Sequence, residues 1–165
     1  MSAARTATQI KAFLAKYSPD IAAQLRAART QLRALFPRGH ELVYDNYNAL
    51  VFGFSPTERS AQAFISIAGY PQWITLFFLR GVDLDDPDRL LEGSGKQVRG
   101  IRLGAQRKLR DPAVRALIEQ AIEPHREALA AGPALKTIVK SISPKQRARR
   151  PAARATPRKK TAARR

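Results

Sequence analysis

The sequence predicts an α+β domain in which about five strands pack against helices, followed by a basic tail that has no fold of its own. Two observations predict the domain. Apolar residues recur at helical spacing near both of its ends, and short runs rich in β-branched and aromatic residues occupy its middle. A third observation predicts the tail, because residues 143–165 contain hardly any apolar side chain beyond alanine and proline.

The first helical region is expected from Ile10 to Phe36, with a break at the sequence YSPD. Ser18 can cap a new helix there, and Pro19 suits the first helical position because an N–H at that position has no partner within the helix. An arginine stripe follows one face of this second helix and consists of Arg26, Arg29 and Arg33. A solvated helix surface is the simplest interpretation of that stripe.

Five strands are expected between residues 40 and 104. ELVYD and ALVFGF are separated by the turn-forming triplet NYN, which predicts a hairpin. AFISIAGY and WITLFFL flank Pro71 and should form a second hairpin, and VRGIRLG supplies the last strand. The alternation of short strands and turns favours antiparallel pairing.

A further helix is expected to begin after Asp111, and Pro124 should kink or restart it. The segment 133–142, which contains LKTIVKSI, repeats a small amphipathic pattern. It is expected to be a short basic segment that docks weakly on the domain or folds only on a partner. The domain itself should therefore run over residues 10–132, after a flexible N-terminus over residues 1–9.

The chain is strongly basic, with 30 Lys and Arg against 13 Asp and Glu and a net charge of +17. Residues 136–165 alone hold twelve basic and no acidic side chains. The absence of cysteine excludes disulfides, thiolate metal sites and cysteine nucleophiles. No apolar run has the length of a signal peptide or a membrane span, so the cytoplasm, including the nucleoid, is the expected location.

The tail, residues 143–165, is expected to be disordered. Ordering a residue costs roughly 1–2 kcal/mol, and this segment cannot bury enough apolar surface to offset that cost. Its removal should therefore leave the fold nearly unchanged. A membrane-surface role is disfavoured, because the neighbouring apolar face is short and lacks Trp and Phe.

Spaced cations without aromatic side chains suit non-specific neutralisation of nucleic-acid phosphates, with no base stacking and no sequence readout. The choice between DNA and RNA stays open, and an extension without any selected role is the alternative. The residues expected to contact nucleic acid are Lys145, Arg147, Arg149, Arg150, Arg154, Arg158, Lys159, Lys160, Arg164 and Arg165.

The sequence LLEGSGKQVRGIRLG is similar to a phosphate-binding loop but fails its pattern. A P-loop requires glycine at the position of Leu90 and a hydroxyl residue at the position of Gln97, and a helix should follow where a strand is expected here. A weaker anion site remains, in which Lys96, Arg99 and Arg102 flank glycines whose N–H groups face one anion.

Tyr44 and Asp45 are the residues expected to join this anion site if a polar pocket forms at the sheet. The alternative is a half-buried Arg99 that pairs with an acidic residue such as Asp45. A β-bulge at Gly100 would be needed to turn Arg99 away from the apolar face that Ile101 shares.

The run LVYDNYNALVFGFSPTERSAQAFISIAGYPQWITLFFLRG, together with LLEGSGKQVRGIRL, resembles the YdhG-like domain family of small bacterial proteins, whose function is unknown. The resemblance covers roughly residues 10–122 and is most specific over residues 44–102. It implies a curved, largely antiparallel sheet packed against helices. Some relatives are described as frataxin-like iron chaperones, but most have no assigned activity, so the resemblance implies a fold more than a function.

Iron handling would require clustered carboxylates, since iron of this kind prefers hard oxygen ligands. The sequence DLDDPD supplies the one dense group, which consists of Asp83, Asp85, Asp86 and Asp88. A solvent-exposed turn with helix-capping residues has the same composition and is the competing interpretation.

No catalytic constellation is evident. His40 lies beside a turn and His125 follows a helix-breaking proline, and neither has metal-ligand spacing to the other. We therefore expect a non-enzymatic protein without a cofactor, in which a YdhG-like domain is attached to nucleic acid by its tail. The alternatives are iron handling through the aspartate-rich loop, and binding of, or reaction on, a small anionic metabolite at Lys96, Arg99 and Arg102.

Overall fold

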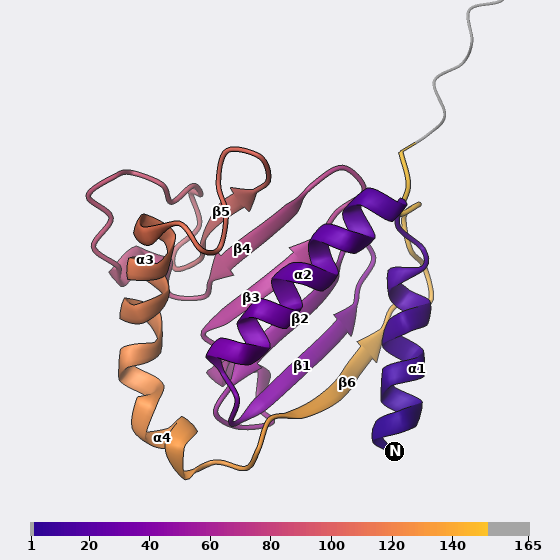
Figure 1. Ribbon diagram of the computed structural model, residues 1–165, viewed down its shortest axis with the longest axis horizontal. Coiled ribbons are helices and arrows are strands. Elements are labelled where there is room, and N and C mark those ends of the chain that lie inside the picture. Colours follow the sequence, from indigo (N-terminus) through magenta and orange to yellow (C-terminus); the bar gives the residue numbers. More distant parts are fainter. Residues whose placement is uncertain (1, 152–165) are drawn as a thin grey trace, which may run out of the picture.

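Six strands form one mixed sheet, in the order β5–β4–β3–β2–β1–β6, in the computed structural model of the chain, which describes residues 2–151 (Figure 1). All neighbours are antiparallel except β1 and β6, which are parallel. The strands are β1 (His40–Asp45), β2 (Leu50–Ser55), β3 (Ile65–Gly69), β4 (Ile74–Phe78), β5 (Arg99–Leu103) and β6 (Lys136–Ile142). The predicted α+β class and its five strands are confirmed, and β6 is an additional strand.

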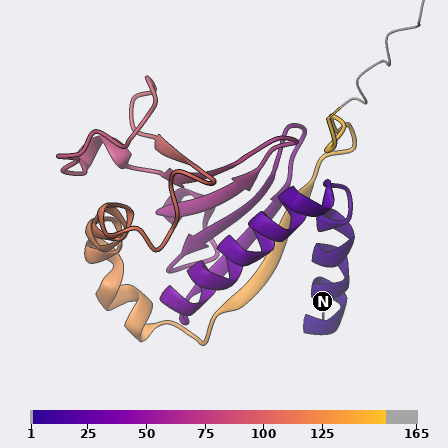
Figure 2. The same cartoon turned by 45° about the horizontal axis from the view of Figure 1, so that its top comes forward.

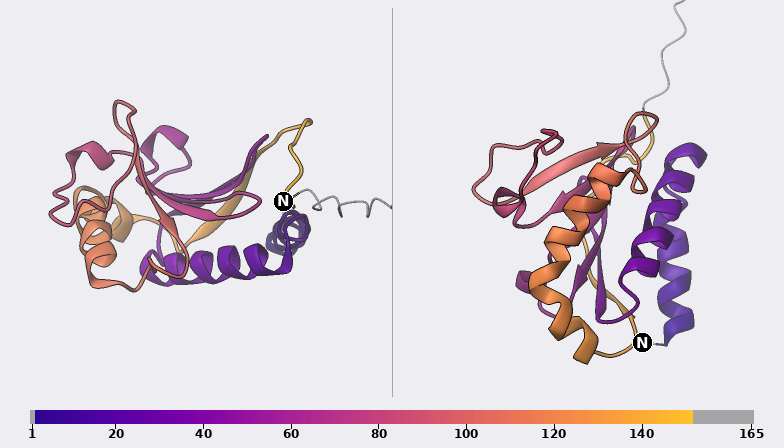
Figure 3. Two further views of the ribbon diagram at one scale, coloured as in Figure 1. Left: turned by 90° about the horizontal axis from the view of Figure 1, so that it is seen from above. Right: turned by 60° about the vertical axis from the view of Figure 1, so that its left-hand side comes forward.

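The helices lie against one face of the sheet, which curves around α2 (Figures 2 and 3). The long helix α2 crosses the sheet, while α1 lies near β6 and α3 lies toward the β5 side (Figure 1). The helices are α1 (Ala3–Leu14), α2 (Pro19–Leu35), α3 (Pro112–Ile122) and α4 (Arg126–Ala131), with 3₁₀ turns η1 (Ser60–Gln62), η2 (Gly81–Asp83) and η3 (Glu123–His125). The opposite face of the sheet carries no α-helix in the described part of the chain.

The helix starts follow the capping residues. Ser18 accepts a hydrogen bond from the Ile21 N–H at 3.5 Å, with Pro19 at the first helical position, as predicted. The prediction of a flexible N-terminus is wrong for residues 2–9, because Ser2 caps α1 by accepting from the Arg5 N–H at 3.2 Å. Burial of Thr6 and Ile10 then fixes this helix to the core.

The core forms between α2 and the alternate residues of each strand. One row of directly paired residues crosses five strands and consists of Val43, Phe52, Ile67, Leu76 and Ile101, none of them more than 2% exposed. Leu25 and Leu32 of α2 are fully buried. Burying a side chain of this size contributes about 1.5–3 kcal/mol, so each residue of this row stabilises the fold by a large amount.

The segment predicted as a loosely attached amphipathic element, residues 133–142, instead contains β6. It pairs in parallel with β1, with Glu41 opposite Thr137 and Val43 opposite Val139. The physical reason is twofold. Consecutive β-branched residues favour a strand, and β1 would otherwise present an unpaired backbone edge. The predicted domain boundary at residue 132 is therefore wrong.

Residues 143–151 also belong to the fold, which corrects the prediction of a disordered tail over this stretch. The Ser143 N–H donates to the Asp45 carbonyl and the Arg147 N–H donates to the Tyr47 carbonyl, both at 2.9 Å. Arg149 is only 3% exposed. The argument from apolar burial missed this segment because polar contacts hold it. Residues 152–165 of the predicted tail lie outside the described residues.

Gly69→Ala is expected to lower the free energy of unfolding by about 1–3 kcal/mol, because an added methyl group overpacks the core. A Cβ at Gly69 would lie 2.5 Å from Leu25 Cδ2 and 3.4 Å from Tyr17 Cζ, and both side chains are fixed by burial. Urea unfolding measures the loss. Gly95→Ala is the matched control, since nothing lies within 4 Å of its Cβ position. Equal losses in the two variants would contradict the packing argument.

Candidate nucleic-acid interface and a separate pocket

The positive charge of the described residues is concentrated toward the β6 side of the molecule. Residues 2–51 and 133–151 form α1, α2, β1, β6 and the C-terminal segment, and they hold thirteen basic and three acidic side chains. Residues 52–132 hold eleven basic and ten acidic side chains. In Figure 1, α1, β1 and β6 lie on the right, whereas β5 and α3 lie on the left. The charge excess therefore belongs to the folded domain as well as to the tail.

Glu41 of β1 is one of those three acidic residues, and its carboxylate is fully buried beneath α2. Arg29 donates to it from Nε at 2.9 Å and from Nη2 at 2.7 Å, and Arg33 donates from Nη1 at 2.6 Å. The Thr137 hydroxyl of β6 donates at 2.7 Å. Two guanidinium groups thus share one carboxylate, which leaves a net positive charge at this point and holds both arginines in place.

Asp45, the second of these acidic residues, is buried at the other end of β1. It contacts Lys16 Nζ at 2.5 Å and Arg149 Nη2 at 3.0 Å. Arg149 Nη1 also donates to the Tyr17 hydroxyl at 2.6 Å, and that hydroxyl donates to the Gly69 carbonyl at 2.6 Å. Burial raises the pKa of Tyr17, which keeps its hydroxyl a neutral donor. Arg149 is therefore a structural residue, and its predicted contact with nucleic acid is wrong.

A groove of about 960 Å³ lies between α1, α2 and the start of β6. Five cationic side chains line it: Lys11, Arg26, Arg29, Arg33 and Lys136. No acidic residue lines it among the residues that the structure describes. Arg29 and Arg33 are held by Glu41, whereas the other three cations have no acidic partner within residues 2–151. The groove therefore contains two arginines that an ion pair holds in place, and three further cations without an acidic partner in the described residues. This arrangement suits phosphate groups.

The five residues predicted to bind an anion do not form one site. Tyr44 and Asp45 end β1, Arg99 and Arg102 lie on β5, and Lys96 lies in the loop before β5. Three strands separate β1 from β5 in the sheet. The alternative pair between Arg99 and Asp45 is excluded by the same separation.

The individual contacts of these residues agree with that separation. Arg99 Nη1 donates to the carbonyls of Gly95 at 2.6 Å and Val98 at 2.8 Å. The Arg102 guanidinium lies over the Trp73 ring, 4.1 Å from its centroid. β5 pairs with β4 in regular register, so Arg99 and Arg102, three residues apart, point to opposite faces. Tyr44 hydrogen-bonds through its hydroxyl to Ser60 Oγ.

The aspartate-rich loop shows the contacts of a structured turn. Asp83 pairs with Arg80 at 2.8 Å, and Asp86 accepts from the Leu90 and Leu91 N–H groups, both at 2.9 Å. Within residues 2–151, no three His, Asp or Glu side chains gather in a way that would hold a metal ion. The geometry therefore gives the predicted iron-binding role of Asp83, Asp85, Asp86 and Asp88 no support.

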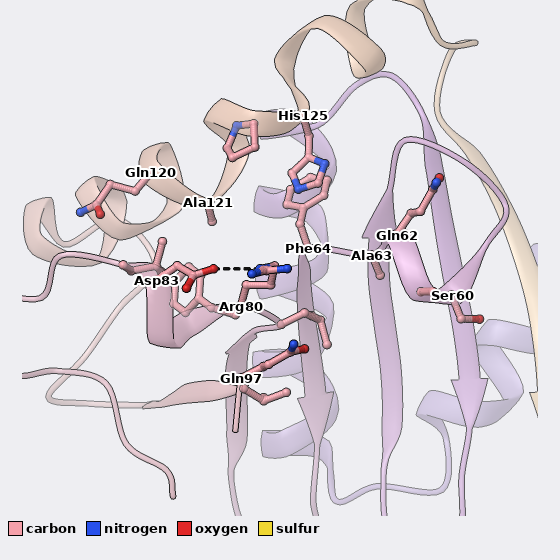
Figure 4. A pocket seen from close by; sticks show the side chains of 16 residues that line it. Ser60, Gln62, Ala63, Phe64, Arg80, Asp83, Gln97, Gln120, Ala121 and His125 are labelled. Atoms are coloured by element: carbon pink, nitrogen blue, oxygen red, sulfur yellow. Dashed lines mark hydrogen bonds and ion pairs between the residues drawn. The ribbon is translucent and has the colours of Figure 1, made fainter. Parts of the chain in front are cut away.

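A second cavity, of about 650 Å³, lies at the end of β3 and β4 and is bounded by η1, η2, the loop before β5, and the α3–η3 junction (Figure 4). Phe64 and Phe78 are buried beneath it. His125 stacks on Phe64, with ring centroids 4.8 Å apart and planes 17° apart. The sequence does not predict this site, because its residues come from separate segments that share no recognisable motif. The one sequence signal is Pro124, which interrupts the helical segment next to His125, where η3 separates α3 from α4.

No protein-family model, curated protein or solved structure matches the chain. The resemblance to YdhG-like domains therefore stays a prediction. None of the helices in residues 2–151 has the length and apolar character needed to span a bilayer.

Burial lowers the pKa of His125 below its usual 6.5. The unfolded chain then binds a proton at higher pH than the folded protein does. The stability contributed by the neutral imidazole is therefore fully present above about pH 6.5 and falls as the pH drops toward the folded pKa. His125→Gln is expected to reduce the loss of stability between about pH 7.5 and pH 5, measured by urea unfolding. His40→Gln, which keeps His125, should retain that loss, and an unchanged pH profile in His125→Gln would contradict the assignment.

Proposed function

We propose that the chain binds nucleic acid non-specifically, through the groove between α1 and α2 together with residues 152–165. The observation that carries the proposal is the groove itself, which five cations line without an acidic residue among those described. Residues 152–165 add six cations and no acidic residue. Just before these residues in sequence, Arg150 donates to the carbonyls of Ala15 at 3.3 Å and Lys16 at 3.4 Å, at the turn between α1 and α2.

Cations that neutralise phosphates gain affinity from the release of condensed counterions, and this gain is independent of base sequence. Arg29 and Arg33 support this role because Glu41 fixes their guanidinium groups before any ligand arrives. Contacts of this kind position a nucleic acid without reading it, so little sequence preference is expected. The proposed role is binding rather than catalysis. It implies a cytoplasmic location, on the nucleoid if DNA is the partner.

The test is fluorescence anisotropy with a labelled duplex of about 20 base pairs and a single strand of equal length, between about 50 and 200 mM salt. If about six to ten phosphates are engaged, affinity should fall by about 10³ to 10⁵ over this range. A response that is nearly flat would overturn the proposal.

The groove is tested by a triple variant, Lys11→Gln, Arg26→Gln and Lys136→Gln, which should reduce the slope of log affinity against log salt by about three. A matched triple variant on the other side of the molecule, Arg107→Gln, Arg110→Gln and Arg115→Gln, removes the same charge from exposed positions. It should leave the slope nearly unchanged. Equal losses in both variants would mean that total charge, and not the groove, determines binding.

A further inference from the structure

We infer that the cavity of about 650 Å³ between η1, η2 and the α3–η3 junction is a binding site for a flat, uncharged heteroaromatic molecule with a hydrogen-bonding edge. The molecule would have about the size of a nucleobase or an aromatic amide. All residues that line the cavity fall within 60–125, in the part of the chain whose charges nearly balance. The inference is therefore independent of the proposed nucleic-acid groove.

The walls of the cavity combine apolar and polar side chains, and small residues leave its volume open. Ala61, Ala63 and Ala121 line it, and larger side chains at these positions would fill it. Beneath them lie the rings of Phe64, just before β3, and Phe78, at the end of β4, which are 4% and 1% exposed. Ligand sites typically have volumes of about 300–1,000 Å³ and mostly apolar walls with a few polar groups. An aromatic ring fits this lining better than a flexible polar chain does.

The polar side chains that line the cavity include Gln62, Gln97 and His125 (Figure 4). Within the described residues, the Gln97 amide and the His125 imidazole have no hydrogen-bond partner. Gln62 uses its oxygen to accept from the Thr57 hydroxyl, which leaves its N–H₂ group free. Carboxamides and a neutral imidazole each supply donors and acceptors, which match the edge of an amide or a ring nitrogen.

Gln120 serves as a contrast, because both ends of its amide are occupied. Its oxygen accepts from the Asp85 N–H at 2.8 Å and its nitrogen donates to the Asp85 carbonyl at 2.9 Å. This pair of bonds joins α3 to the loop after η2 and holds that wall of the cavity in place. Gln120 is therefore a positioning residue, whereas Gln97 is available to a ligand.

The charges around the cavity disfavour an ionic ligand. Arg80 and Asp83 form an ion pair at 2.8 Å beside it, marked by the dashed line in Figure 4. On the outer side of the junction, Arg126 pairs with Glu119 and Glu123. The cavity thus faces balanced or slightly negative charge, so an anion gains no net attraction. An uncharged ligand avoids the desolvation penalty of an ion.

The test uses three probes of similar size, each added to the full chain and followed by two-dimensional ¹H–¹⁵N NMR. Nicotinamide is flat and uncharged, benzoate is flat and anionic, and cyclohexanecarboxamide is uncharged but not flat. Nicotinamide is expected to shift the side-chain resonances of Gln62, Gln97 and His125 in a saturable manner. The other two should bind at least about tenfold more weakly. Benzoate binding as tightly as nicotinamide, or no saturable shift with any probe, would overturn the inference.

Variants locate the binding. Gln97→Ala should weaken the binding of nicotinamide by about tenfold. Gln106 is exposed and lies outside the cavity lining, so Gln106→Ala should leave the affinity unchanged. Ala121→Leu should abolish binding by filling the cavity. Ala61 is exposed, so Ala61→Leu fills the cavity from its surface and replaces Ala121→Leu in the test if that variant fails to fold. Undiminished binding in Gln97→Ala and in a folded cavity-filling variant would also overturn the inference.

Discussion

The Arg149→Met variant is expected to unfold at a lower urea concentration than the natural chain, with a free energy of unfolding lower by about 3 kcal/mol. Methionine has comparable length but cannot donate to Asp45 or to the Tyr17 hydroxyl, as Arg149 does at 3.0 and 2.6 Å. Removing one partner of a buried ion pair leaves the other charge uncompensated. Lys16 still contacts Asp45, so the loss lies at the low end of the usual range.

Arg150→Met is the matched control, because the neighbouring side chain is exposed and donates only to two backbone carbonyls among the described residues. It should change the free energy of unfolding by less than about 0.5 kcal/mol. A chain ending at Pro151 should also keep its stability, whereas a chain ending at Ile142 should lose at least as much as Arg149→Met. Equal stability of all these variants would show that residues 143–151 contribute nothing to the fold.

The Glu41→Ala variant should lose about 3–5 kcal/mol, because it removes the buried carboxylate that separates two guanidinium groups. Arg29 and Arg33 would then face one another with like charge, and the Thr137 hydroxyl would lose its acceptor. Chemical unfolding in urea measures the loss. Glu58→Ala removes a carboxylate whose side chain is 62% exposed, and it should change stability by less than about 0.5 kcal/mol.

A second substitution distinguishes charge repulsion from the loss of packing. Adding Arg29→Met to Glu41→Ala removes one of the two opposed cations, so it should restore part of the stability. If the double variant is less stable than Glu41→Ala by the full effect of Arg29→Met alone, the two residues are not coupled. The assignment of Glu41 as the shared partner would then be wrong.

The elements with local signals could be predicted from the sequence. The starts of α2 and α3 are marked by Ser18–Pro19 and Asp111–Pro112. The turn at residues 46–48 separates β1 from β2, and the turn at residues 71–73 separates β3 from β4. β6 was missed because its apolar residues also fit helical spacing. Pairing with the edge of β1 favours the strand over the helix, and that edge lies nearly a hundred residues earlier in the chain.

The candidate sites were harder to predict, since each depends on residues distant in sequence. The composition of residues 143–151 indicates no core, but one arginine there meets Tyr17 and Asp45 in a buried polar network. A segment that ion pairs hold in place cannot be recognised from its content of apolar residues. The stripe of α2 arginines has the pattern of a solvated face, yet Arg29 and Arg33 contact Glu41 because β1 runs directly beneath them.

The attachment of β6 and Arg149 next to β1 has a consequence for biosynthesis. The ribosome makes the strand that covers the β1 edge, and the arginine that reaches Asp45, well after β1 itself. Until then the nascent chain exposes an unpaired strand edge, which is prone to associate with other chains. The sheet is therefore complete only after β6 has been synthesised, and a chain that stops before residue 149 leaves the Asp45 carboxylate without its arginine partner.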